Sequence, residues 1–263
     1  MDNETDPSHI RVHALSVADD LGYRGQLAVS QTVSGRSDYR LIGGHMVRLL
    51  LHVYPSERAV PRSTVDADTA LGDVEVIGVV TRQLQEDGFI KVGGNVLKKT
   101  VAPDQDVEIN FLLPRDDYKT GIKSINVQSV GQVDTLSELS FALNSPAVVI
   151  DVEARLLGGE IIEYQTRVPS VEVAAILKAH SWSSRHSTKD LADLNTLLEI
   201  REEHPELSWR LDSRPLIGRR LDTARILRPL GKQITRRRSP IELPNNVSRV
   251  RFAALIQEHI GAP

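Results

Sequence analysis

Asp66 and Asp68, two aspartates separated by a single residue, are the side chains in this sequence best suited to chemistry. In an extended backbone, alternate side chains project from one face, so the two carboxylates would lie side by side and repel each other. A divalent cation relieves that repulsion, and Mg²⁺ prefers oxygen ligands while keeping positions open for phosphate oxygens. The pair therefore indicates a magnesium site suited to a nucleoside triphosphate. The alternative interpretation is a solvated strand face.

A glycine pair, Gly43-Gly44, lies upstream of the aspartates. It opens a segment, His45 to Val53, whose apolar residues recur at helical spacing, and a proline-containing loop from Tyr54 to Thr64 follows. Glycines at a helix start let backbone N–H groups approach phosphates closely, next to the positive end of the helix dipole. A plain tight turn is the alternative, but the ordered combination with Asp-x-Asp favours phosphate binding.

These motifs resemble those of the nucleotidyltransferase superfamily related to DNA polymerase beta. The matching stretches are Leu41-Ile42-Gly43-Gly44 and Arg62-Ser63-Thr64-Val65-Asp66-Ala67-Asp68. The resemblance implies that Asp66 and Asp68 bind Mg²⁺, with Mn²⁺ as the alternative metal. It also implies that Gly43 and Gly44, with Arg62 and Thr64 beside them, hold the triphosphate.

The sequence departs from that superfamily pattern in two places. The spacer before Asp66 is longer than usual, so we expect residues 54–61 to form an inserted loop. The identity of the third metal-binding carboxylate is left open by the sequence. We choose Glu108 on the predicted strand Val107 to Leu113, but Asn110 could occupy the position where relatives carry Asp. Asp151 is a further candidate.

A second group of residues narrows the resemblance. Arg167 to Ser170, Lys178, Arg185 and Lys189 to Leu194 resemble the downstream motif of the AbiEii-type nucleotidyltransferases, the toxin halves of bacterial toxin–antitoxin pairs. The resemblance implies that Lys178 contacts the nucleotide phosphates and that Arg185 and Lys189 line the site. It also implies that Asp190 or Asp193 completes the site. The alternatives are that both aspartates complement a helix dipole and that Lys178 extends to the surface.

The elements that position these residues change character along the chain. A flexible start and a polar segment, Ser30 to Arg40, precede the glycine pair. Alternation places Asp66 and Asp68 on a strand that begins at Val65, and a helix is expected over 73–87, ending at Gly88. Further strands are predicted over 89–101, 107–113, 122–133, 147–157 and 161–168, with a hairpin turn at Gly158-Gly159.

From Ser170 onward the pattern is helical. Ser170 is the expected N-cap of a helix over 171–180, and a second helix is expected over 188–202. The remainder is predicted to be mostly helical with breaks at Pro215, Pro229 and Pro240. The sequence thus predicts an α/β (α+β) fold: a mixed sheet with flanking helices in a nucleotidyltransferase domain over 1–169, followed by a helical domain over 170–263 that contributes site residues.

Composition limits the classes of chemistry. The 263 residues include no cysteine, which excludes disulfides, thiolate zinc sites and a cysteine nucleophile. No secretory signal or membrane span is recognisable, so we expect a cytoplasmic protein. Net charge is −3, yet arginines crowd 210–238 near Trp209, which indicates either contact with an RNA backbone or a solvated basic helix face.

These observations together predict a metal-dependent nucleotidyltransferase. By the resemblance, a nucleoside triphosphate would donate its nucleoside monophosphate to an RNA acceptor such as a tRNA end, and a cognate antitoxin would restrain the activity. One alternative is an inactive protein of the same fold that binds a nucleotide, RNA or a partner protein. A second is an enzyme of the antibiotic-modifying kind that acts on a small molecule.

Overall fold

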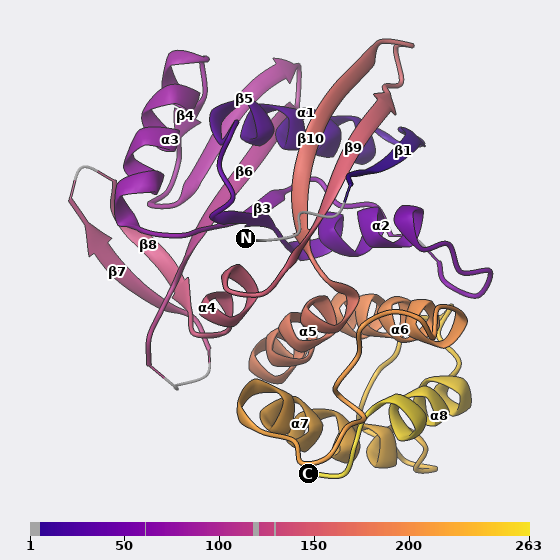
Figure 1. Ribbon diagram of the computed structural model, residues 1–263. Coiled ribbons are helices and arrows are strands. Elements are labelled where there is room, and N and C mark those ends of the chain that lie inside the picture. Colours follow the sequence, from indigo (N-terminus) through magenta and orange to yellow (C-terminus); the bar gives the residue numbers. More distant parts are fainter. Residues whose placement is uncertain (1–5, 61, 118–120, 129) are drawn as a thin grey trace.

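The computed structural model describes residues 6–60, 62–117, 121–128 and 130–263, and Figure 1 shows a strand-rich part beside a helical part. Every described strand precedes residue 170, and the helices that follow gather on one side of the sheets. The two sheets each contain parallel and antiparallel pairs. The mixed α/β class predicted from the sequence is therefore confirmed.

The larger sheet carries the Asp-x-Asp motif. Its main path runs in the order β2-β3-β6-β5-β4, and β8 joins β6 and pairs with β7. Strands β3 and β6 are parallel neighbours, with Asp68 opposite Asn110. The strands are β2 (Tyr39–Leu41), β3 (Ala67–Leu71), β4 (Ile90–Lys91), β5 (Val96–Ala102), β6 (Gln105–Pro114), β7 (Lys123–Val127) and β8 (Gly131–Leu136).

The smaller sheet has the order β1-β9-β10 and comprises β1 (Ser8–His13), β9 (Ala147–Arg155) and β10 (Ile161–Pro169). The predicted hairpin between β9 and β10 is confirmed, and Gly159 has the positive φ of +85° that favours glycine in such a turn. The expected flexible start is wrong beyond residue 7, because β1 pairs in parallel with β9. That pairing joins segments about 140 residues apart, and no local pattern reveals it.

Four helices accompany the sheets: α1 (Val17–Thr32), α2 (Gly43–Val53), α3 (Val74–Glu86) and α4 (Glu138–Leu143). The predicted helices that follow Gly43 and Asp73 are confirmed, and the Asp73 carboxylate caps α3 by accepting from two backbone N–H groups. Helices α1 and α4 were not predicted. Ser16 is the N-cap of α1, and its hydroxyl accepts a hydrogen bond from the backbone N–H of Asp19. Helix α1 packs against β6 of the larger sheet and β10 of the smaller sheet.

The helical part contains α5 (Val171–Arg185), α6 (Thr188–Glu203), α7 (Gly218–Ile234) and α8 (Arg249–His259). Ser170 is the N-cap of α5, as predicted, and α5 runs five residues past its expected end. The break expected at Pro229 is wrong, because Pro229 lies inside α7. It is exposed there, so water can reach the freed carbonyl, while the neighbouring Leu227 and Leu230 are buried.

Two predicted strands prove to be pairs of strands. The segment 89–101 divides into β4 and β5 at Gly93-Gly94, where Gly94 lies so close to the backbone of Gln132 that a Cβ would collide with it. The segment 122–133 belongs to the β7–β8 hairpin. Glycines lie at both junctions: Gly93-Gly94 between β4 and β5, and Gly131, with a φ of +90°, at the first residue of β8.

One hydrophobic core extends through both parts of the chain. It includes Leu49 of α2, Ile109 of β6, Leu197 of α6 and Leu227 of α7, all of them wholly or almost wholly buried. Helices α5 and α6 pack directly on α2, so the helical part is fixed next to the helix that follows the glycine pair. Among the described helices, none combines the length and the apolar character needed to cross a membrane.

Candidate functional site

The glycine pair lies at the turn between β2 and α2. Gly43 has a φ of +72°, a conformation that favours glycine, and a Cβ at this position would collide with the carboxylate of Asp68. The backbone N–H of Ile42 donates to the carbonyl of Asp68 at 2.9 Å, which fixes the turn against β3. The N-cap residue of α2, Ile42, makes no side-chain cap, so the first N–H groups of this helix can serve an anion.

Asp68 lies on β3, whereas Asp66 immediately precedes that strand, which begins two residues later than predicted. The Thr64 hydroxyl donates to Asp66 at 3.2 Å, and the Asn110 amide donates to Asp68 at 3.0 Å. Burial, and then the charge of Asp66, raises the pKa of Asp68 to about 6. A site that penalises a buried negative charge in this way is suited to a cation.

The opposite wall of the site is cationic, with Lys178, Arg185 and Lys189 from the helical part and Arg62 from the segment before β3. Lys178 of α5 lies 2.7 Å from Asp193 of α6, and Arg62 makes two hydrogen bonds to the same carboxylate, at 3.0 and 3.1 Å. Arg185 makes two hydrogen bonds of 2.7 Å to Asp190, which raise the pKa of Arg185. Because Asp190 and Asp193 are buried, they fix the cations in place.

A cavity of about 230 Å³ separates the two walls. Asp66 and Asp68 are its acidic members, and four cationic side chains face them. Its lining comprises Gly43, Gly44, Arg62, Thr64, Asp66, Asp68, Lys178, Arg185, Ser187 and Lys189. The fold thus brings together most of the residues singled out from the sequence. Ser187 was missed, although it lies between the predicted residues Arg185 and Lys189.

Four acidic residues named from the sequence lie elsewhere. Asp190 and Asp193 are behind the cations, wholly or almost wholly buried. Glu108 forms an ion pair with Lys98 at 2.8 Å on the neighbouring strand. Asp151 lies on β9 of the smaller sheet, where it accepts a hydrogen bond from Gln165. None of the four lines the cavity that contains Asp68.

Asn110, which the sequence left open as the occupant of the third ligand position, lies opposite Asp68 on the neighbouring strand β6. Its amide nitrogen donates to Asp68, and its amide oxygen accepts from Asn95 at 2.5 Å. Asn110 is therefore fully engaged with its neighbours. The metal ligands available here are thus the carboxylates of Asp66 and Asp68. Two carboxylates fit a Mg²⁺ ion that takes its remaining ligands from phosphate oxygens and water.

A second cavity, of about 170 Å³, adjoins the first and shares Gly43, Asp68, Lys178 and Arg185 with it. Half of its other lining residues are large and apolar: Ile42, Met46, Leu112, Ile122, Leu136, Leu139 and Leu177. Glu138 of α4 and His180 of α5 add a polar patch to this lining. Sequence reasoning missed both residues, because they lie 42 positions apart and match no known motif.

Internal contacts occupy part of the arginine-rich segment 210–238. Arg219 pairs with Glu138, Arg220 with Glu172, and Arg225 with Asp222. Trp209 is buried, and its indole N–H donates to the carbonyl of His259, so Trp209 is not available to stack on a base. Arg236, Arg237 and Arg238 are exposed beyond the end of α7 and could contact a phosphate backbone.

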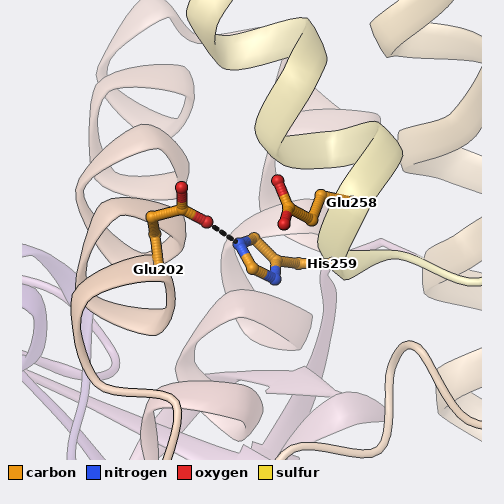
Figure 2. Close-up of side chains that lie close together, drawn as sticks. All are labelled: Glu202, Glu258 and His259. Carbon is orange, nitrogen blue, oxygen red and sulfur yellow. Dashed lines mark hydrogen bonds and ion pairs between the residues drawn. The ribbon is translucent and has the colours of Figure 1, made fainter.

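A group of potential metal ligands lies in the helical part, as Figure 2 shows. Within the described ranges, Glu202, Glu258 and His259 offer ligand atoms that all lie within 4.8 Å of one another. His259 already pairs with Glu202 at 2.8 Å, and Arg251 lies 3.3 Å from the same carboxylate. These contacts join α6 to α8 and balance the negative charge, so we assign the group a structural role.

Comparison with solved structures finds a weak likeness in fold. The chain is similar to the crystal structure of an antigenic nucleotidyltransferase-like protein from Paracoccidioides brasiliensis, over 93% of this chain and 95% of that one. The two share 16% sequence identity, and the TM-score is 0.47. No protein-family model and no curated protein matches the sequence. A likeness at this level assigns neither a family nor a function to the chain.

Proposed function

We propose that this protein is a metal-dependent nucleotidyltransferase, which transfers a nucleoside monophosphate from a nucleoside triphosphate to an acceptor hydroxyl. The observation that supports it best is the shared cavity, in which Asp66 and Asp68 face a glycine-opened helix start and the cations of the helical part. Each component suits one part of a metal-bound triphosphate. The resemblance of the two sequence motifs to nucleotidyltransferases supports the same conclusion.

Each side chain has a definite task in this hypothesis. Asp66 and Asp68 would hold Mg²⁺, which, when bound, neutralises and orients phosphate oxygens. The N–H groups at Gly43 and Gly44, with Lys178 and Arg185, bind the phosphates and stabilise the charge that develops as the acceptor oxygen attacks the α-phosphorus and pyrophosphate leaves. Arg62, Thr64 and Lys189 complete the phosphate site.

Two further residues act indirectly. Asp190 holds Arg185, and Asp193 holds both Lys178 and Arg62. Since both carboxylates are buried behind these cations, we assign them positioning roles rather than contact with the substrate. Glu108, already paired with Lys98, is not required as a metal ligand in this hypothesis.

For the acceptor we propose an RNA end, such as that of a tRNA. The exposed Arg236, Arg237 and Arg238 support this choice, because arginines bind a phosphate backbone. By the AbiEii resemblance, the protein would act in the cytoplasm and an antitoxin would restrain it. A small-molecule acceptor is the alternative within the same reaction class.

The test is transfer of label from α-³²P nucleoside triphosphates, supplied with Mg²⁺ and either total tRNA or a mixture of aminoglycosides. The natural protein is compared with Asp66→Ala, because Asp66 lies outside the strand and its loss spares the Asp68–Asn110 contact. We expect label in the tRNA arm that Asp66→Ala abolishes.

The matched control is Asp151→Ala, which removes a carboxylate from the smaller sheet and should transfer normally. Label in the aminoglycoside arm alone would replace the RNA acceptor with a small molecule. No transfer by the natural protein with any of the four triphosphates, under Mg²⁺ or Mn²⁺, would contradict the proposal.

Asn110 favours a second candidate, a protein that binds a nucleotide without transferring it. An amide stands where a third carboxylate would bind a second metal ion, and its oxygen is already occupied. In that case a fluorescent ATP analogue would bind, its binding would require Lys178 and Mg²⁺, and the transfer assay would show no labelled acceptor. The two candidates are thus separated by the same set of variants.

A further inference from the structure

The apolar cavity beside Asp68 contains a buried glutamate–histidine pair that the proposed function does not yet use. His180 Nδ1 lies 3.2 Å from Glu138 Oε1, and both side chains are only 4% exposed. Arg219 of α7 and the Ser137 hydroxyl also contact this carboxylate oxygen, at 3.4 and 3.1 Å. Glu138 is thereby fixed beneath the cavity, with His180 next to it.

The ring nitrogens of His180 are the unusual feature. Among the described residues, both are buried without a well-aligned hydrogen bond, although Nδ1 lies 3.2 Å from Glu138 and the side chain lines the cavity. A buried polar atom without a partner is destabilising, so the position of Nε2 calls for a ligand that supplies one. A carboxylate beside Nδ1 favours the tautomer in which Nδ1 carries the hydrogen and Nε2 can accept one.

We propose that this cavity holds the alcohol group of the acceptor, and that His180 Nε2 takes the proton from that hydroxyl during transfer. The inference rests on the proposed nucleotidyltransferase function. It assigns the cavity between α2, α4 and α5 to the acceptor, next to the phosphate cavity with which it shares Asp68, Lys178 and Arg185. Glu138 is then a positioning residue that orients the ring.

The reaction balances without any additional reagent. The acceptor oxygen forms a bond to the α-phosphorus, and the bond between that phosphorus and the oxygen bridging to the β-phosphate breaks. Pyrophosphate leaves with the electron pair of that bond. The hydroxyl proton moves to His180 Nε2, and Glu138 stabilises the resulting imidazolium.

Asn110 supplies the reason for such a base. An amide cannot take a proton from the acceptor, and its oxygen already accepts from Asn95. Asp66 and Asp68 are assigned to the cation. Within the lining of the acceptor cavity, His180 combines a buried position, a free ring nitrogen and a carboxylate at its other nitrogen.

The pKa of Glu138 agrees with this arrangement. Burial by itself would raise it, but the contacts with His180 and Arg219 lower it below its ordinary value, so the glutamate stays charged. A charged carboxylate at Nδ1 is the partner that a proton-accepting imidazole requires.

The test measures transfer by His180→Ala, His180→Asn and Glu138→Gln, in whichever acceptor arm labels with the natural protein. We expect kcat to fall about 100-fold or more in both His180 variants, within the range typical of a lost general base. Binding of a fluorescent ATP analogue with Mg²⁺ should stay unchanged. Added imidazole should restore part of the activity of His180→Ala, because that variant leaves space for it.

His259→Ala is the matched control, since His259 is also buried and also pairs with a glutamate (Figure 2), but it is not among the residues that line either cavity. It should keep normal kcat and show no response to imidazole. His180 variants that fold, bind the analogue and transfer at the natural rate would overturn the assignment while leaving the proposed function intact. A natural protein without transfer would overturn both.

Discussion

The carboxylate of Asp68 should make the metal-free protein less stable at neutral pH. Its folded-state pKa of about 6 lies above the ordinary value of 3.8, because the site is buried and Asp66 is close. The folded protein therefore holds this proton more tightly than the unfolded chain does. The contribution of Asp68 to stability is greatest below pH 3.8 and is lost as the pH rises through 6.

The size of the effect follows from the shift. The pKa difference of roughly two units corresponds to about 3 kcal/mol at about 1.4 kcal/mol per unit. Because the carboxylate borders a cavity that water can enter, we expect about 1–3 kcal/mol. Asp68→Asn removes the charge, and its amide oxygen can still accept from Asn110. The variant should thus be more stable than the natural protein by that amount at about pH 8.

Urea unfolding in EDTA measures this difference at about pH 8 and again at about pH 5, where about half of the gain should remain. Asp151→Asn, a substitution of the same kind in the smaller sheet, is the control. Adding Mg²⁺ with a non-hydrolysable ATP analogue should reverse the order of stability, because only the natural protein keeps both carboxylates. The electrostatic argument would be refuted if Asp68→Asn were less stable than the natural protein at about pH 8 in EDTA. It would also be refuted if the difference in stability were the same at both pH values.

Three further variants test neighbouring parts of the structure. Gly43→Ala should weaken binding of a fluorescent ATP analogue about tenfold or more, since its Cβ would displace Asp68 from the turn; unchanged affinity in a titration would contradict this geometry. His45 has its pKa lowered by burial to about 4, so its contribution to stability is lost as the pH falls from 6.5 towards 4. On acidification the free energy of unfolding should therefore fall less in His45→Gln than in the natural protein, by up to about 3 kcal/mol. Urea unfolding at both ends of that pH range measures the difference. Asp193→Asn should lower the stability by up to about 3 kcal/mol, because the buried Lys178 loses its nearer carboxylate and keeps only Asp190, at 3.7 Å; a melting temperature within a degree of the natural value would argue against the network.

Local signals in the sequence were sufficient where the structure is local. Gly43 permits a turn with positive φ, and apolar residues at helical spacing predict α2 directly after it. Ser170 caps α5, and Gly158-Gly159 closes the β9–β10 hairpin. In each case the side chain acts on backbone within a few residues, so the physical cause is contained in the segment itself.

The sequence did not reveal contacts between distant segments. The partner strand of β1 lies about 140 residues downstream, and the ion pair of Glu108 with Lys98 required the register of β5 on β6. Pro229 could remain in α7 because it faces solvent, a fact that depends on how the helix packs. Propensity alone therefore predicted a break at Pro229, where packing lets the helix continue.

The sequence by itself determined the mixed α/β class, the glycine turn and the order in which acidic and basic motifs follow it. Only the tertiary structure decided which of those motifs share a cavity, because α5 and α6 must pack on α2 before Lys178 and Arg185 can approach Asp68. The same packing put Asn110 beside Asp68 and joined Glu138 to His180. Burial and mutual distance govern the charge and the reach of a side chain, and neither is a property of residues considered singly.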